Sequence, residues 1–190
     1  MTTLQDSTEE AIATLRSLSS LEGALDRAAE MIRRCLLGGS KLLVCGNGGS
    51  AADGADFSTE FTCRFKKDRR PYPAMNLSAG GSLLTAVGND YAFSEVFARQ
   101  VQAFGQTGDI LVAFTTSGNS RNILRAIEEA TRKGLQSIAF LGKDGGAAAG
   151  LATVELLVRS QTTARIQEAH KFLLHTLCEI LEEDLVKGGG

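Results

Sequence analysis

The sequence predicts an α/β domain with a five-stranded parallel sheet, helices on both of its faces, two leading helices and a long final helix. Five short apolar runs are each followed by Gly, Ser or Asn, and most of them then lead into a helical pattern. This alternation is typical of a parallel sheet covered on both faces. A chain of 190 residues with 43% hydrophobic content can bury one core of good size. The predicted strands are residues 41–45, 72–78, 109–115, 136–142 and 153–158.

The helices are predicted from caps and from the helical period. Ser7 and Glu10 have the spacing of a capping box, which places a helix start at Ser7. Apolar residues between Leu21 and Leu36 recur at the helical period, and the pattern stops at Gly38. We expect one structural domain. Leading helices over 1–37 should pack on this domain and on partner subunits, and the main part over 38–187 should end in a helix over 164–186. The glycine tail over 188–190 is excluded from the fold.

Charge and cysteine content narrow the class of protein. Lys plus Arg total 20 and Asp plus Glu total 22, and neither sign forms a long block, so no nucleic-acid or membrane binding is predicted. No apolar run approaches the roughly 20 residues of a membrane span. The chain shows no CxxC pair and no signal-peptide pattern, so we expect a reduced, cytoplasmic protein. Its four cysteines are scattered, at Cys35, Cys45, Cys63 and Cys178.

A glycine-rich loop, "CGNGGSAAD", follows the first predicted strand and opens a helix. Ligands of parallel sheets gather at the carboxyl ends of the strands, where glycines expose backbone N–H groups and a helix N-terminus attracts anions. Gly46, Gly48 and Ala51 fit the dinucleotide pattern G-x-G-x-x-A, but the second strand lacks the acid that this pattern needs at its end. The phosphate loop of nucleotide-binding proteins is also excluded, because no Gly-Lys-Ser/Thr follows. A simple tight turn stays open as an alternative.

A second loop, "TTSGNS" at 115–120, repeats this arrangement after the third strand. It collects four hydroxyl groups at another helix N-terminus. Taken alone, the loop is equally consistent with a capped helix in which Ser120 is the N-cap. Two such loops in one sheet predict a small phosphorylated metabolite as the ligand.

Five motifs in this order carry a family resemblance: "CGNGGSAAD", "AVGNDYAFSEVFARQV", "GDILVAFTTSGNS", "GKDGG" and "RIQEAH". Together they resemble the phosphoheptose isomerases, also called sedoheptulose 7-phosphate isomerases, of the sugar isomerase (SIS) fold. The resemblance extends from about Gly39 to Leu185. It implies a homotetramer that interconverts sedoheptulose 7-phosphate and D-glycero-D-manno-heptose 7-phosphate, a step toward the heptoses of cell-surface glycans.

The resemblance also assigns roles to residues. Glu60 is implied as the carboxylate that transfers a carbon-bound proton, and His175 as its acid/base partner. From the residues alone, without the family resemblance, Glu60 is interpreted as a solvated helix residue and His175 as a packed core histidine. Arg64 reads equally as a surface arginine, and Asn89 with Asp90 as a plain turn. The implied substrate contacts are Asn47, Gly48, Gly49, Ser50, Glu60, Arg64, Asn89, Asp90, Thr115, Thr116, Ser117, Ser120 and Gln167.

The sequence departs from the family at one position. The family pattern has a histidine one turn before the glutamate, as a zinc ligand together with Glu60, Gln167 and His175, and this chain has Asp56 there. Aspartate binds zinc through oxygen, so the tentative metal site is Asp56, Glu60, Gln167 and His175 with zinc, another divalent ion or no metal. The departure also leaves the exact sugar open.

The spacing of two implied site residues predicts a shared site. Gln167 and His175 are separated by about 12 Å of rise and roughly 80° of rotation on one helix. We therefore expect one of them to serve the site of a neighbouring chain. Two rival functions stay open: an isomerase for another sugar phosphate, and a non-catalytic regulator like the SIS-fold protein that binds the replication initiator DnaA. The presence of both Glu60 and His175 argues against the regulator.

Overall fold

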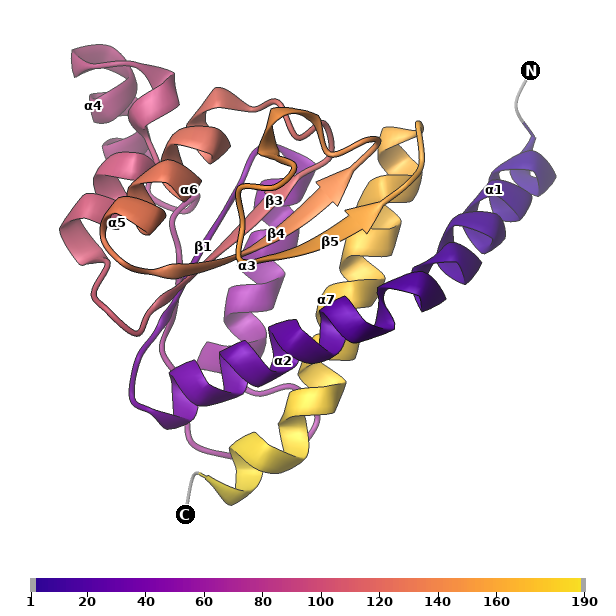
Figure 1. Ribbon diagram of the computed structural model, residues 1–190, viewed down its shortest axis with the longest axis horizontal. Coiled ribbons are helices and arrows are strands. Elements are labelled where there is room, and N and C mark those ends of the chain that lie inside the picture. The colour runs from indigo at the N-terminus through magenta and orange to yellow at the C-terminus, as the bar shows by residue number, and fades with distance from the viewer. Residues whose placement is uncertain (1–2, 189–190) are drawn as a thin grey trace.

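The computed structural model describes residues 3–188 and confirms the predicted sheet (Figure 1). Its five strands are all parallel, in the order β2-β1-β3-β4-β5. In the central register, Val44 pairs with Asn76 on one side and with Val112 on the other. The strands are β1 (Leu42–Gly46), β2 (Ala74–Asn76), β3 (Ile110–Thr115), β4 (Gln136–Gly142) and β5 (Val154–Val158).

Helices cover both faces of the sheet, and alternate strand residues supply the two cores. Leu42 and Val44 of β1 belong to one apolar cluster, and Leu43 and Cys45 belong to the other. This period of two is what a strand buried on both faces requires. The first face carries α2 (Glu22–Leu37), α3 (Gly49–Thr62) and α7 (Thr163–Lys187), and the second carries α4 (Gly81–Asp90), α5 (Ala98–Phe104) and α6 (Arg121–Arg132).

The first helix, α1 (Leu4–Ser17), begins three residues earlier than the sequence pattern predicts. The capping box is formed by Thr3 and Asp6: the Thr3 hydroxyl accepts from the Asp6 N–H at 3.1 Å, and the Asp6 carboxylate accepts from the Thr3 N–H at 2.8 Å. Ser7 lies inside the helix, and the Glu10 carboxylate accepts the hydroxyl of Thr162 instead. The Ser7–Glu10 prediction was wrong because an equivalent pair stands nearer the N-terminus.

Two further boundaries differ from the prediction, those of the second strand and of the glycine tail. β2 has three residues, because Pro71 and Pro73 precede it and the buried Tyr72 hydroxyl donates to the Leu185 carbonyl at 2.8 Å. The segment after β2 forms α4. The predicted glycine tail begins inside the fold, since Gly188 is the C-cap of α7 and donates to the Asp184 carbonyl; Gly189 and Gly190 lie outside the described residues.

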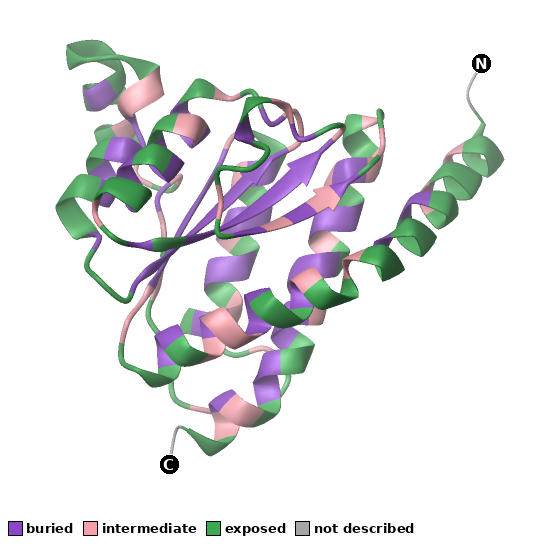
Figure 2. Ribbon diagram, in the orientation of Figure 1, coloured by how far each residue is buried: buried purple, intermediate pink, exposed green. Residues whose placement is uncertain are grey.

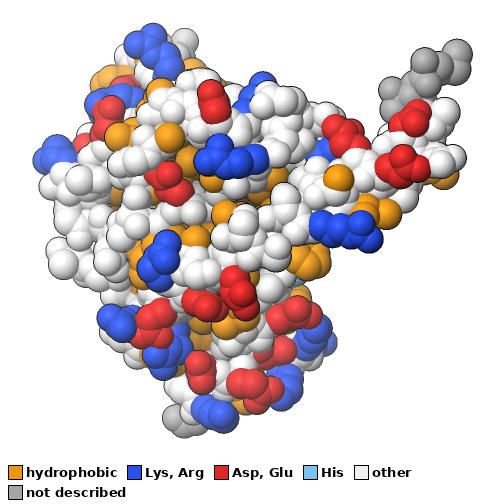
Figure 3. All heavy atoms as spheres, turned by 45° about the vertical axis from the view of Figure 1, so that its right-hand side comes forward, with side chains coloured by type: hydrophobic (Ala, Val, Ile, Leu, Met, Phe, Trp, Pro, Cys, Tyr) orange, Lys and Arg blue, Asp and Glu red, His pale blue; other side chains and the backbone are white. Residues whose placement is uncertain are grey.

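The leading helix α1 extends away from the body of the domain as an arm (Figures 1 and 2). It makes its contacts with α7 and with the 3₁₀ turn at Leu18–Leu21. Exposed apolar side chains lie along it, including Leu4, Ile12 and Leu15 (Figure 3). Over residues 3–188, the structure contains no helix with the length and apolar content needed to span a membrane.

Candidate active site

The glycine loop joins β1 to α3 at the carboxyl edge of the sheet. Gly48 is the N-cap of α3, with a φ of 56° that side-chain-bearing residues rarely adopt. The loop is tied to the end of β2, because the Ser78 hydroxyl accepts from the Gly46 N–H at 3.2 Å and donates to the Gly46 carbonyl at 2.9 Å. Gly48 and Gly49 are exposed at the helix N-terminus, where backbone N–H groups favour an anion.

Two amide side chains join this loop to the start of α6. Asn47 and Asn122 exchange a pair of hydrogen bonds of 2.9 and 2.8 Å. The same two residues line a hollow of about 320 Å³ together with Phe93, Ser94, Ser120 and Arg121. The structure therefore brings the glycine loop and the end of the hydroxyl loop to one cavity.

The hydroxyl loop, residues 115–120, is held by its own contacts and by the loop after β4. Gly118 has a φ of 65°, and a Cβ there would overlap the Gly145 carbonyl. Thr115 is buried and accepts from the Gly118 N–H at 3.2 Å, so its hydroxyl faces the chain itself. Ser120 is the N-cap of α6, but its side chain makes no capping hydrogen bond. Together with the partly exposed Thr116 and Ser117, Ser120 offers hydroxyl groups toward a ligand.

Helices α3 and α7 both start at the carboxyl edge and lie side by side (Figure 1). The Gln167 amide lies over Gly49, so closely that a Cβ on Gly49 would overlap it. Further along, the Lys171 ammonium reaches Asp53, and the two helices stay in contact. We call the contact zone of α3 residues 49–60 with α7 residues 167–178 the α3/α7 seam.

An ammonium group lies between two carboxylates in this seam. The Nζ of Lys171 is 3.0 Å from Asp53 Oδ1 and also pairs with Asp56 Oδ2. Burial raises the pKa of Asp53, against the opposing effect of Lys171, and the Asp53 Oδ2 atom has no partner among the described residues. Burial alone would lower the pKa of Lys171, but its hydrogen bonds to Asp56 and Asp53 outweigh this effect and raise it. Lys171 is therefore a fixed cation in the seam.

The two histidines of the chain have different surroundings. His170 is 0% exposed, its Nε2 lies 3.0 Å from the Leu141 carbonyl, and burial lowers its pKa to about 4. It is thus a neutral core residue. His175 is half-buried and stacks on Phe65, just beyond the end of α3, with ring centroids 6.0 Å apart. His175 therefore lies between α7 and the segment after α3, and His170 lies beneath the sheet edge.

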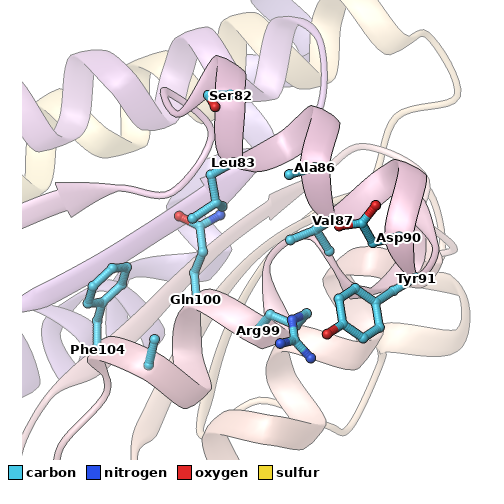
Figure 4. A pocket seen from close by; sticks show the side chains of 10 residues that line it. Ser82, Leu83, Ala86, Val87, Asp90, Tyr91, Arg99, Gln100 and Phe104 are labelled. Atoms are coloured by element: carbon cyan, nitrogen blue, oxygen red, sulfur yellow. The ribbon is translucent and has the colours of Figure 1, made fainter.

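Three of the implied substrate contacts lie elsewhere in the chain. Arg64 is exposed beyond the end of α3 and donates to the Lys66 carbonyl at 3.0 Å. Asn89 and Asp90 form the exposed last turn of α4, where the Asn89 amide donates to the Asp90 carboxylate. Asp90 lines a different hollow, of about 490 Å³, between α4 and α5 beside Tyr91 and Arg99 (Figure 4).

The four tentative metal ligands do not fit a metal centre within one chain. Gln167 lies over the first turn of α3, whereas Asp56 is two turns further along and is paired with Lys171. Over residues 3–188, no three His, Cys, Asp or Glu side chains are grouped closely enough to hold a metal ion. A metal at Asp56 would have to displace the Lys171 ammonium.

Sequence reasoning missed Lys171, Asp53 and Asn122. Lys171 stands in the apolar stretch of α7, four residues after Gln167. The helical period therefore predicts that Lys171 and Gln167 lie on the same face of the helix. Asp53 likewise precedes Asp56 by one turn. Nothing in the sequence marks Asn122, whose partner Asn47 is 75 residues away.

The class of protein is defined by a family comparison. The model of the SIS domain family matches residues 8–142, well over half of the chain. Among curated proteins, the phosphoheptose isomerase of Shewanella denitrificans is 47% identical over 186 residues, covering 96% of this chain and 95% of that protein.

Solved structures agree with this result. A phosphoheptose isomerase from Francisella tularensis is 39% identical with a TM-score of 0.92, covering 96% of this chain and 100% of that one. The enzyme from Neisseria gonorrhoeae is also 39% identical, with a TM-score of 0.88 and coverage of 95% and 100%. The chain belongs to the phosphoheptose isomerase family of SIS domains. It is an isomerase that acts on a sugar phosphate.

Proposed function

We propose that this protein interconverts sedoheptulose 7-phosphate and D-glycero-D-manno-heptose 7-phosphate in the cytoplasm. The observation that carries the proposal is the α3/α7 seam: α3, which carries Glu60, starts at the glycine loop and packs beside α7, which carries Gln167 and His175, and the Gln167 amide lies over Gly49. The 47% identity to a phosphoheptose isomerase over nearly the whole chain supports the heptose substrate.

The proposed chemistry moves a carbonyl group from C2 to C1 of the sugar. The Glu60 carboxylate takes the proton from C1 of the ketose, which produces an enediolate, and returns it to C2. His175 transfers a proton between the two oxygens, so that no free charge accumulates on either of them. Helix N-termini and the hydroxyls of Thr116, Ser117 and Ser120 bind the phosphate.

Subunit association is part of the proposal. Asn89 and Asp90 lie at the end of α4, away from the seam of their own chain, and exposed apolar residues lie on surfaces that we expect a second copy to cover. Leu15 and Phe172 border one such surface between α1 and α7, and Tyr91 and Phe104 border the hollow in Figure 4. We infer a homotetramer whose active sites combine residues of neighbouring chains.

The family resemblance implies zinc, which as a Lewis acid polarises the carbonyl oxygen when it is bound. No step proposed here depends on a metal. The test is a panel of seven-carbon and six-carbon ketose phosphates, assayed with and without a chelator. Turnover restricted to sedoheptulose 7-phosphate supports the proposal. A preference for a six-carbon substrate would replace it with another sugar-phosphate isomerase, and binding without turnover would support a regulator.

A further inference from the structure

The Asp53–Lys171–Asp56 cluster occupies the part of the seam where the family pattern has a metal ligand. Asp56 stands at the position of the family histidine, and its carboxylate already has a cation as partner. Asp53 is 7% exposed, so its charge depends on Lys171, which is itself two-thirds covered. The cluster is thus a structural feature of the seam, because the Asp53 carboxylate is buried and the Lys171 ammonium pairs with both Asp53 and Asp56.

The ammonium and a divalent metal exclude each other at this position. A metal bound to Asp56, whose side chain is 60% exposed, would lie within a few ångströms of the Lys171 charge and would compete with it for the same carboxylate. Removing Lys171 to make room would leave Asp53 buried without its cation. The helices therefore hold either the lysine or the metal.

We propose that this isomerase works without a bound metal, because Lys171 supplies a positive charge to the seam. In the family pattern, a divalent metal supplies the positive charge at this position. The proposal rests on the isomerase function proposed above. Lys171 acts as a positioning residue: it holds Asp56 toward α7 and offsets one of the two negative charges that lie one turn and two turns before Glu60. One uncompensated negative charge, instead of two, then remains in the cluster that precedes the proposed proton-transferring carboxylate.

The first test is the metal content of the native chain. The protein is incubated with zinc, desalted and measured by elemental mass spectrometry. We expect far less than one zinc ion per chain and the same turnover before and after chelator treatment. Retention of roughly one zinc per chain, or a chelator effect above about tenfold, would overturn the proposal.

The second test exchanges the lysine for a metal site. The double variant Asp56→His/Lys171→Met restores the imidazole and removes the ammonium, and we expect it to gain zinc binding in competition with a chromogenic chelator. Lys171→Arg keeps the charge and is the matched control, for which no gain is expected. Equal zinc binding by the native chain, the control and the double variant contradicts the proposal.

Folding of the variants needs its own control, because Lys171→Met leaves Asp53 unpaired. Asp53→Asn/Lys171→Met removes both buried charges together and should keep the native circular dichroism spectrum. We expect this variant to lose roughly 10²-fold in turnover, and Lys171→Arg to lose less than about tenfold. Equal turnover of the native chain and Asp53→Asn/Lys171→Met would contradict the proposed role of Lys171 as the positive charge of the seam. Zinc binding is measured without substrate, so the zinc-binding tests stand even if the native chain isomerises no heptose phosphate.

Discussion

The two edges of the sheet use ion pairs in opposite ways. At the amino edge, the Asp109 carboxylate is 3% exposed and accepts from Lys41 Nζ at 2.6 Å, from the Lys41 N–H at 3.0 Å and from the Gln106 N–H at 2.8 Å. At the carboxyl edge, Lys171 is shared between two carboxylates, and Asp53 keeps a buried oxygen without a partner among residues 3–188. The comparison shows that the pair at the amino edge is fully satisfied and joins the starts of β1 and β3, whereas the cluster between α3 and α7 keeps one unsatisfied oxygen within the site that we propose for catalysis.

Among the variants, replacing Glu60, the proposed proton-transferring carboxylate, should have the largest effect. Glu60→Gln keeps the shape of the side chain but removes the base, so we expect the isomerisation rate to fall by roughly 10² to 10⁴-fold. Turnover is measured by NMR of the sugar phosphates, with thermal melting as the check on the fold. Glu128→Gln, on the exposed surface of α6, is the matched control and should keep full activity. Native turnover in Glu60→Gln would remove Glu60 from the mechanism.

At the amino edge, the expected effect is on stability and not on chemistry. Asp109→Ala leaves Lys41 and two backbone N–H groups without their acceptor, which should lower the free energy of unfolding by about 3 to 5 kcal/mol. Urea unfolding measures this loss. The protein that remains folded should retain its kcat/KM, and a parallel loss of kcat/KM would show that the two edges are not independent.

His170 shows that a titratable residue near the carboxyl edge can have a purely structural role, because it is buried in the core. Its pKa is about 4 in the folded state and about 6.5 when unfolded, so the unfolded state binds the proton first as the pH falls. Its contribution is fully present above pH 6.5 and is lost toward pH 4, with a total of about 3 kcal/mol.

His170→Gln is the variant that isolates this contribution, since its amide can still donate to the Leu141 carbonyl but does not titrate. Urea unfolding at several pH values should show a shallower loss of stability in acid for the variant than for the native chain. Identical pH profiles for the two proteins would mean that His170 is not held neutral by burial.

The smallest expected signal comes from mixed subunits. Glu60→Gln and His175→Ala chains are each expected to lose most of their turnover. If each site takes these two residues from different chains, about a quarter of the sites should hold both native residues after random mixing. Subunit exchange is confirmed first by mass measurement of the oligomers. If mixed oligomers form without recovered turnover, the two residues serve each site from the same chain, or one of them is not catalytic.

Much of the fold and part of the site were predictable from the sequence, for a local reason. Apolar runs such as 109–115 and 136–142 match β3 and β4 within one residue, because burial on both faces leaves a continuous apolar signature. The glycine loop and the hydroxyl loop were found for the same reason, since each is a contiguous stretch of six to nine residues at a strand end.

What the sequence by itself determined is therefore whatever a single segment encodes: the strands, the loops at their ends, and through the family motifs the class of enzyme. Only the tertiary structure decided which charges meet. Asp53 and Lys171 are 118 positions apart and adjacent only because α3 and α7 pack in parallel, and Asn47 meets Asn122 only because β1 and β3 are neighbours. Pairing between distant segments depends on packing geometry, which no local sequence pattern records. For that reason, the pairing of the Lys171 ammonium with α3 could be identified only from the tertiary structure.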